Sequence, residues 1–363
     1  IFDEMIYVDG ARSILSGHGI LSPEHPPLAK LMFAAGMAIA GDNAIGWRLA
    51  SVTCGSVIVL AIFQWTWLLT RDYQLALMAA CLTLLNNFLF VMSRTTMLDI
   101  PMLMFSMCAL LAYTAALKLE IGTGLRRTLI VLTGVLLGLS GACKWTAVNT
   151  LGAVLAFTGF LVLLRWVPSL RARSGLQKEL ENINRIGIPA LLLGLVVAPA
   201  ITYSMAYIPV FLTSHTPFSF VGVLQIQEQM WTLSKGVSGN RAIFSPWYEW
   251  PFMASPMRGL SYLMGNPAVM WTGVVAIAVC CWRFLKSPAL AEGLVVLTYF
   301  LNLLQWIVTP RPVTFYYYYF PSAMILSTAL AVVLWRSGRR KIFGIRISLA
   351  LIVAAAAVFL YCY

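Results

Sequence analysis

Long apolar runs recur along the chain from residue 46 to its last residues, and they limit most strongly what it can fold into. A helix needs about 20 apolar residues to cross the hydrocarbon core of a bilayer, and most of these runs approach that length. Since 60% of the 363 residues are hydrophobic and only 10% are charged, a soluble fold of this length would leave much apolar surface in water. The sequence therefore predicts an all-α polytopic membrane protein with about ten visible transmembrane helices. The expected spans are 46–69, 74–92, 99–117, 128–142, 145–165, 186–212, 266–283, 289–308, 316–335 and 343–361.

The apolar segment at residues 28–41 differs from these runs because it is too short to span a bilayer. It follows Pro26 and Pro27, and proline is favoured in the first turn of a helix. We expect an interfacial helix here, lying on the outer surface of the membrane.

Basic residues indicate which ends of the spans face the cytoplasm. One set of connecting loops holds most of the 25 Lys and Arg residues, in short segments such as those around Arg71, Arg171 and Arg340. The positive-inside rule makes this set cytoplasmic, which explains the formal charge of +12 without a nucleic-acid partner. Residues 1–45 and 213–265 are then expected on the outer face.

The chain is accordingly divided into four segments. Residues 1–45 form the first outer loop, 46–212 a set of transmembrane helices, 213–265 a second outer loop and 266–363 the remaining transmembrane helices. Because the chain opens on the outer face, we expect a further span upstream of residue 1.

The cysteines fall in or at the ends of apolar runs, without CxxC spacing. We expect them to be small buried hydrophobic side chains rather than redox or metal groups. They are Cys54, Cys81, Cys108, Cys143, Cys280, Cys281 and Cys362.

Unusual polar and aromatic motifs are concentrated in the outer segments and at the outer ends of the spans. In chain order they are the pair Asp3-Glu4, HPPLAK at 25–30, GWRL at 46–49, RTTMLD at 94–99, KWTA at 144–147, SPWYEWP at 245–251 and four tyrosines at 316–319. In this order the motifs resemble the protein O-mannosyltransferase family, within the C-type (GT-C) polyprenyl-phosphate-dependent glycosyltransferases. The resemblance covers nearly the whole chain. It departs from the family at 213–265, which is too short for the extra module of eukaryotic members, and in the absent first helix.

This resemblance implies a GT-C type fold and a membrane glycosyltransferase. The implied reaction moves a sugar, with mannose as the expected one, from a polyprenyl-phosphate carrier to a hydroxyl acceptor, with protein Ser or Thr as the expected acceptor. The expected location is a prokaryotic cell membrane, with the active site on the extracytoplasmic side. The implied partners are the lipid-linked donor, the acceptor and membrane lipid.

Carboxylates in the first outer segment and at the outer end of a span are the candidate catalytic groups. A sugar phosphate already has a good leaving group, so one carboxylate acting as a base suffices, whereas glycoside hydrolysis needs two. By resemblance, Asp3 is the general base and Glu4 supports it. The resemblance also implies that the transferred sugar has inverted anomeric configuration in the product. Asp99 opens a helix and is the third candidate, although the helix dipole alone favours an acidic residue there.

Basic residues at the outer membrane edge are candidates to hold the departing phosphate, which needs positive charge. They are Arg48, Arg94, Lys144 and Arg311. The alternative for each is snorkelling toward lipid headgroups. Arg48 ranks first because it lies in GWRL and its planar fork can hold two phosphate oxygens.

His25, beside the Pro-Pro turn, is a further candidate for substrate binding, with a simple polar contact as the alternative. A divalent metal held by Asp3, His25, Asp99 and His215 is an open alternative for a cofactor. The spacing of these residues matches no known metal motif, so no cofactor is assigned.

The aromatic segments at 247–250 and 316–319 have two interpretations. An interfacial aromatic belt is the first, and stacking on sugar or acceptor is the second. Glu292, near the cytoplasmic start of a span, is expected to make a local polar contact.

Two competing functions follow from the same pattern. A relative that modifies lipid A or another glycan would use the same donor chemistry. A secondary transporter would show two related halves and polar residues near the bilayer midplane, whereas the ionisable residues here gather at the outer edge.

Overall fold

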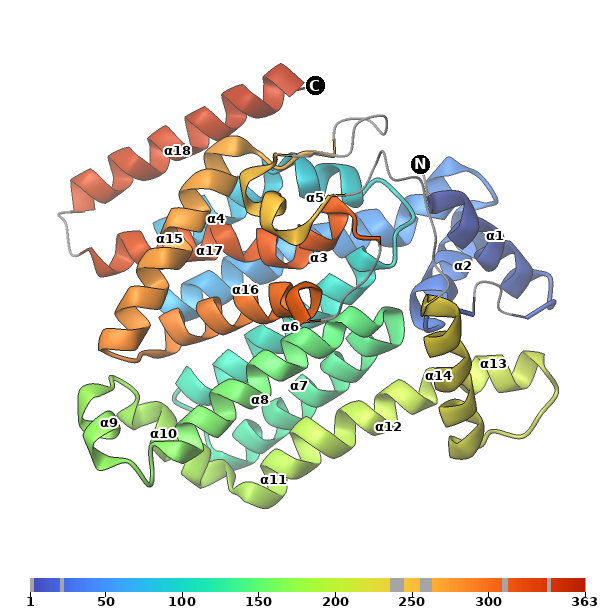
Figure 1. Ribbon diagram of the computed structural model, residues 1–363, viewed down its shortest axis with the longest axis horizontal. Helices are drawn as coiled ribbons and strands as arrows, with labels where there is room; N and C mark the ends of the chain where they lie inside the picture. Colours follow the sequence, from blue (N-terminus) through green and yellow to red (C-terminus); the bar gives the residue numbers. More distant parts are fainter. Residues whose placement is uncertain are drawn as a thin grey trace.

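The computed structural model describes residues 3–19, 23–235, 245–254, 263–308, 313–337 and 341–362, with the backbone alone at 235, 341–345 and 362. Every regular element in these ranges is a helix (Figure 1). The α-helices are α1 (Glu4–Leu15), α2 (Leu28–Ala40), α3 (Ala44–Thr70), α4 (Tyr73–Leu84), α5 (Asn87–Met92), α6 (Asp99–Lys118), α7 (Thr123–Cys143), α8 (Val148–Leu163), α9 (Pro168–Arg173), α10 (Gln177–Ile186), α11 (Ile188–Leu192), α12 (Ala198–Met205), α13 (Ile208–Thr213), α14 (Phe220–Lys235), α15 (Pro267–Lys286), α16 (Leu290–Val308), α17 (Phe320–Arg336) and α18 (Lys341–Cys362).

Eight of the expected spans coincide with helices long and apolar enough to cross a membrane, within the described ranges. The expected span at 74–92 is instead two shorter helices, α4 and α5. The chain breaks there because the backbone of Asn86 is extended and its side chain caps α5, accepting a hydrogen bond from the N–H of Phe88 at 3.1 Å. The expected span at 343–361 falls on α18, whose described apolar part is also shorter.

The span expected at 186–212 is continuous but irregular. It consists of α11, a five-residue π-helical segment η2 (Leu193–Val197), α12 and α13. Proline occupies the first turn of α11 and α13, where its missing N–H costs no helical hydrogen bond. Pro199, in contrast, follows the π-helical segment directly, within the continuous helix.

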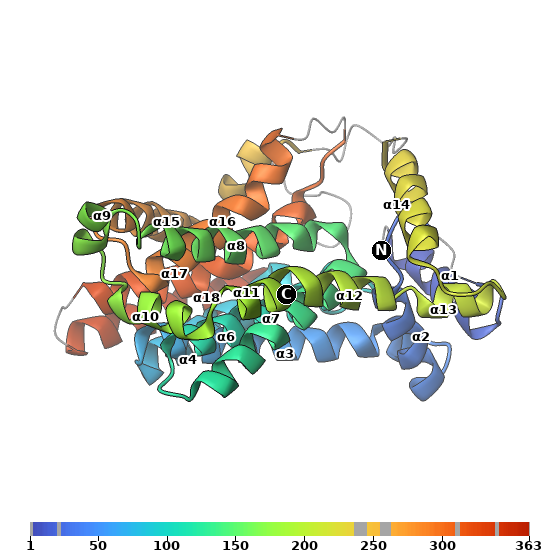
Figure 2. The same ribbon diagram turned by 90° about the horizontal axis from the view of Figure 1, so that it is seen from below.

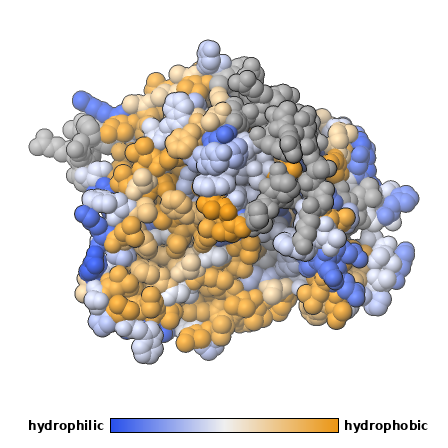
Figure 3. All heavy atoms as spheres, viewed as in Figure 1, coloured by the Kyte–Doolittle hydropathy of each residue, from blue (hydrophilic) through white to orange (hydrophobic). Residues whose placement is uncertain are grey.

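The spans pack around α6 and α17, which are the most enclosed of the long helices. Helix α6 contacts α3 and α7, and α17 contacts α4, α15 and α16. The surrounding helices carry exposed apolar side chains, such as Leu60, Leu132 and Val275, on the sides that face away from the bundle. Figure 3 shows this as a broad hydrophobic face over the helix bundle, with hydrophilic residues toward its two ends. Lipid is the solvent that such a surface requires.

The two ends of the bundle are built differently (Figures 1 and 2). Helices α1, α2, α13 and α14 gather at one end, which the basic-residue pattern assigns to the outer face. Helices α9 and α10 lie at the opposite end. Glu292 also lies at that end, and its buried carboxylate accepts a hydrogen bond from Arg336 at 2.9 Å, which confirms the expected local contact.

The first outer segment is helical rather than an irregular loop. Helix α2 occupies the predicted position of the interfacial helix, and α1 was not predicted. The buried face of α1 includes Glu4, Tyr7, Val8 and Ala11, which follow the i, i+3, i+4, i+7 spacing of an amphipathic helix. That spacing was a readable signal in the sequence.

Close backbone contacts fix the helices that carry the outer end. A Cβ atom on Gly36 of α2 would lie 2.7 Å from the carbonyl oxygen of Gly46 in α3, so only glycine permits this approach. A Cβ atom on Gly134 of α7 would lie 1.6 Å from the carbonyl oxygen of Gly194 in η2. Small residues allow such close helix packing in membranes.

Gly134→Ala is therefore expected to lower the stability of the purified protein, by about 1 to 3 kcal/mol as for other overpacked cores. The added methyl group meets backbone that cannot rotate away. Thermal unfolding in detergent measures the change. The matched control is Gly159→Ala in α8, where an added Cβ meets nothing within 4 Å. Equal melting temperatures for the two variants would contradict the close contact.

Candidate functional site

Helix α1 presents Asp3 and Glu4 at the outer end of the bundle. Asp3 is the residue that precedes the first turn of α1, and Glu4 begins the helix. Asp3 is half-buried and Glu4 is buried. The two neighbouring carboxylates turn toward different partners, so each has its own chemical environment.

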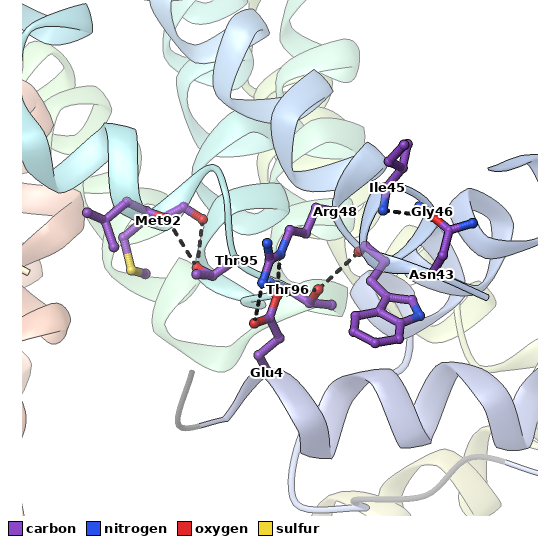
Figure 4. A network of polar contacts seen from close by, with 10 residues as sticks. Glu4, Asn43, Ile45, Gly46, Arg48, Met92, Thr95 and Thr96 are labelled. Carbon is purple, nitrogen blue, oxygen red and sulfur yellow. Dashed lines mark hydrogen bonds and ion pairs between the residues drawn. The ribbon is translucent and has the colours of Figure 1, made fainter. Parts of the chain in front are cut away.

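Glu4 joins three elements of the chain (Figure 4). Arg48 of α3 donates to both of its carboxylate oxygens, from Nε at 2.8 Å and from Nη2 at 3.0 Å. The backbone N–H of Thr96, in the loop before α6, donates to Oε1 at 3.2 Å. The Thr96 hydroxyl lies 3.3 Å from the same oxygen and 3.0 Å from the carbonyl oxygen of Trp47. Burial opposes the charge on Glu4, but these donors outweigh it and lower the pKa of the carboxyl.

Asp99 and Lys144 form a second, deeper charge pair. Asp99 is in the first turn of α6, and Lys144 follows the last residue of α7, so two helix ends bring them together. The Lys144 ammonium lies 2.8 Å from both oxygens of Asp99. Both side chains are more than nine-tenths buried. A buried charge is stable only when paired in this way.

The Lys144 ammonium also faces aromatic rings and Asp3. It lies 5.3 Å from the ring centroids of Tyr317 and Tyr318, at a distance where the negative ring face attracts a cation. The Tyr317 hydroxyl donates to Oδ2 of Asp3 at 3.2 Å. Asp3, Lys144 and Asp99 are therefore brought into one cluster through Tyr317.

The electrostatics of Asp3 differ from those of Glu4. Burial raises the pKa of the Asp3 carboxyl above its ordinary value of 3.8, and the negative charges of Asp99 and Glu24 act in the same direction. The Lys144 ammonium and the Tyr317 hydrogen bond act in the opposite direction. A carboxylate with a raised pKa binds a proton more strongly, which is what a general base requires.

The HPPLAK turn supports this cluster from one side. The His25 ring centroid lies 6.2 Å from that of Tyr7, one turn after Asp3 on α1. Lys30 is fully buried, and its ammonium donates to the carbonyl oxygen of His25 at 3.0 Å. Burial lowers the pKa of Lys30 to about 8. The sequence motifs contained Lys30 and Tyr317 but predicted neither of these contacts, and Tyr7 lay outside every motif.

The other two basic candidates do not join the described cluster. The Arg94 guanidinium is exposed and lies 3.6 Å from the ring centroid of Phe90. Arg311 lies outside the described residues.

The tyrosine run is buried in protein rather than arranged as an interfacial belt, so that interpretation was wrong for residues 316–319. Their hydroxyl groups have protein partners: Tyr317 bonds Asp3, and the hydroxyls of Tyr319 and Tyr299 lie 2.8 Å apart. The SPWYEWP segment packs beside them, with the Trp250 and Tyr318 ring centroids 6.4 Å apart. Aromatic side chains thus form one wall of the cluster.

A small cavity of about 10 Å³ borders Asp99 and Tyr318. Thr146 and Asn302 contribute polar groups to its lining, and Trp306 an aromatic ring. This volume is close to the minimum for one water molecule.

The described residues contain no group of three or more His, Cys, Asp or Glu side chains that could hold a metal ion. Both oxygens of Asp99 accept hydrogen bonds from Lys144. The residues present therefore do not fit a divalent cation at Asp99. His215, the other histidine considered as a metal ligand, lies in the turn after α13.

The six described cysteines are free and lie in or beside the spans.

Comparison with known proteins gives a consistent picture. Residues 3–213 match the profile of a family described as dolichyl-phosphate-mannose-protein mannosyltransferase. A polyprenol-phosphate-mannose–protein mannosyltransferase of Mycobacterium tuberculosis (strain CDC 1551 / Oshkosh) is 24% identical, over 92% of this chain and 75% of the relative. The protein of the same name from Corynebacterium glutamicum is 22% identical, over 95% of this chain and 79% of the relative.

Two solved structures are similar in fold. The protein O-mannosyltransferase Pmt1-Pmt2 complex of S. cerevisiae, bound to its sugar donor, matches with a TM-score of 0.81 and 13% identity, covering 99% of this chain and 85% of that chain. ArnT from Cupriavidus metallidurans, bound to undecaprenyl phosphate, matches with a TM-score of 0.63 and 15% identity, covering 96% and 58%. The expected all-α, GT-C type fold is confirmed.

Glu4→Gln is expected to lower the melting temperature of the purified protein, because hydrogen bonds to charged groups typically contribute about 1.5 to 3 kcal/mol. The native pKa of Glu4 is lowered, so the stabilisation is present above its unfolded-state value and is lost as pH falls through the lower folded-state value. The difference between wild type and variant should therefore shrink below about pH 4.5.

Glu120→Gln is the matched control for this measurement. Glu120 also pairs with a basic residue, Lys178, but its side chain is 86% exposed. Exposed ion pairs contribute little, so this variant should melt like the wild type. An equal effect in both variants would contradict the structural role of the buried Glu4 pair.

Proposed function

Because the chain belongs to the dolichyl-phosphate-mannose-protein mannosyltransferase family, we propose that it transfers mannose from a polyprenyl-phosphate carrier to a hydroxyl group of a protein at the outer face of the membrane. The chain is an integral, multi-pass membrane glycosyltransferase. The observation that carries the mechanism is the half-buried Asp3 carboxylate, whose pKa is raised beside the Lys144–Asp99 pair.

Asp3 is the proposed general base. It accepts the proton of the acceptor hydroxyl while that oxygen attacks the first carbon of the sugar. The bond from this carbon to the phosphate oxygen breaks, and its electron pair stays on the polyprenyl phosphate. Attack from the face opposite the leaving group inverts the configuration of that carbon. The hydrogen bond from Tyr317 orients the carboxylate and leaves its other oxygen for the proton.

Lys144 and Arg48 are the proposed sources of positive charge for the departing phosphate. Lys144 is held rigidly by Asp99, so its charge is placed before the reaction begins, which is the arrangement that stabilises a transition state most. Arg48 uses Nε and Nη2 for Glu4, and among the described residues nothing bonds its Nη1. Its side chain is 37% exposed, so Nη1 is open to a phosphate oxygen. Arg94, Arg311 and His25 stay weaker candidates for substrate binding.

A protein acceptor is favoured over lipid A or another glycan. The curated relatives that cover most of this chain are named as protein mannosyltransferases. The likeness to ArnT is at 15% identity and bears on the fold alone. Transfer to Ser or Thr is the proposal for the acceptor side chain, since these residues supply the aliphatic hydroxyl groups of proteins. The buried carboxylates at one end of the bundle also favour an enzyme over a transporter, whose sites lie near the bilayer midplane.

Asp3→Asn should abolish mannose transfer in membranes supplied with a polyprenyl-phosphate mannose donor and a Ser/Thr-containing peptide. The amide keeps the shape of the side chain but cannot take the proton, and loss of a general base typically costs about 10² to 10⁴ in rate. In the wild type the rate should fall as pH falls through the raised pKa of Asp3, because protonation removes the base.

Asp9→Asn is the matched control. Asp9 lies on the same helix, but its side chain is 57% exposed and pairs with Arg12. This variant should transfer mannose at the wild-type rate. Full activity of Asp3→Asn would refute the assignment of the base, and transfer to a lipid or glycan with none to peptide would refute the acceptor.

Arg48→Lys tests the proposed phosphate contact. The substitution keeps one positive charge, but lysine has a single nitrogen, so it cannot hold Glu4 with two nitrogens and present a third to the phosphate as the guanidinium can. Charge develops on the phosphate as the glycosidic bond breaks, so kcat should fall more than the donor KM rises. Glu4→Gln separates the two roles of Arg48, because it removes the ion pair and leaves the guanidinium in place. An unchanged kcat in Arg48→Lys would assign Arg48 to structural support alone.

A further inference from the structure

An apolar groove of about 500 Å³ lies between α3 and α6 at the start of α4. Since α3 begins beside Glu4 at the outer end, this groove near its last turns lies toward the opposite end, which the basic residues assign to the cytoplasm. Phe63, Trp67 and Tyr73 line it with aromatic rings, and Leu111 lines it from α6. Its volume is typical of a site for a small ligand.

Gln64 is an unusual residue in this lining. It is exposed on a transmembrane helix, and its amide makes no hydrogen bond within the described parts of the chain. In a bilayer an unpaired amide on a lipid-facing surface is costly. Gln64 precedes the end of α3 by six residues, or about 9 Å along the helix axis. This depth corresponds to the region just below the lipid headgroups.

Positive charge flanks the same end of the groove. The Arg71 guanidinium is exposed and lies 5.0 Å from the ring centroid of Trp67. The neighbouring Asp72 carboxylate is turned to α4, where its Oδ1 accepts hydrogen bonds from the N–H groups of Gln74 and Leu75. Within the described ranges Arg71 has no ion pair. Lys118, one turn beyond the groove on α6, donates to the carbonyl oxygen of Leu69.

We propose that this groove binds one anionic phospholipid from the cytoplasmic leaflet. The phosphate and anionic headgroup contact Arg71, the Gln64 amide donates to an ester carbonyl oxygen, and one acyl chain lies along Phe63, Trp67 and Leu111. The groove is apolar, with an amide partway along it and a cation at its end. A phospholipid has its acyl chain, ester and phosphate in the same order. The charge complementarity favours an anionic lipid over a second helix, because the phosphate of the lipid itself supplies the anion for Arg71.

Native mass spectrometry of the detergent-purified protein tests this binding, with phosphatidylglycerol as the anionic probe and phosphatidylcholine as the neutral one. The wild type should retain one phosphatidylglycerol in preference to phosphatidylcholine. Arg71→Asn should weaken that retention about tenfold or more, since a charge-assisted contact is lost. Asparagine suits this position because Arg71 has a left-handed backbone, with φ of 57°. Leu111→Trp fills the groove without changing charge and should displace the lipid as well.

Lys286→Ala is the matched control. Lys286 is another basic residue at the cytoplasmic end, and its ammonium lies 4.6 Å from the ring centroid of Trp282. It should retain phosphatidylglycerol like the wild type. Equal loss in Lys286→Ala and Arg71→Asn would show diffuse attraction to basic surface and overturn the site. Equal retention of the two lipids would overturn the proposed site. A change of oligomeric state in a Gln64→Leu variant would overturn it too, because the occupant of the groove would then be a protein helix.

Discussion

The buried carboxylate of Glu4 is the contact on which the outer end of the molecule depends. Through Arg48 and Thr96 it ties α1 to α3 and to the loop that starts α6. The position of Asp3 follows from this, because Asp3 directly precedes Glu4 and cannot move without it. The position of Asp99 follows too, since it begins α6 three residues after Thr96. One ion pair therefore sets the spacing between the two carboxylates that flank Lys144.

The neighbouring residues Asp3 and Glu4 show how environment divides two similar groups. Glu4 is given several strong donors and keeps its charge, so it acts as a structural anion. Asp3 has one neutral donor and sits in a partly buried position among other negative charges. The pKa of Asp3 is raised, whereas that of Glu4 is lowered, so Asp3 is the carboxylate suited to exchange a proton.

The lengths of the apolar runs, the basic loops and the order of the motifs were enough to predict the helical class, the positions of most spans and the family. They were not enough to predict the pairs that build the site. Tyr317 and Asp3 are separated by 314 residues, and Lys144 and Asp99 by 45, so only the packed helices reveal these contacts. The break at Asn86 was missed because an apolar run hides a capping side chain. Helix α1 was missed although its spacing was readable.

The π-helical segment at 193–197 has an effect well beyond its own five residues. Such a segment holds one residue more than the α-helix around it, and each residue turns an α-helix by about 100°. The side chains after Val197 are therefore rotated around the helix axis relative to those before it. This rotation lets Tyr203 and Tyr207 face Trp145, which directly follows Lys144. Trp145 also donates a hydrogen bond to Gln227 of α14 and so anchors that helix beside the site. If the same sequence formed an uninterrupted α-helix here, both tyrosines would be turned by about 100° away from Trp145, and α14 would lose the hydrogen bonds that hold it there.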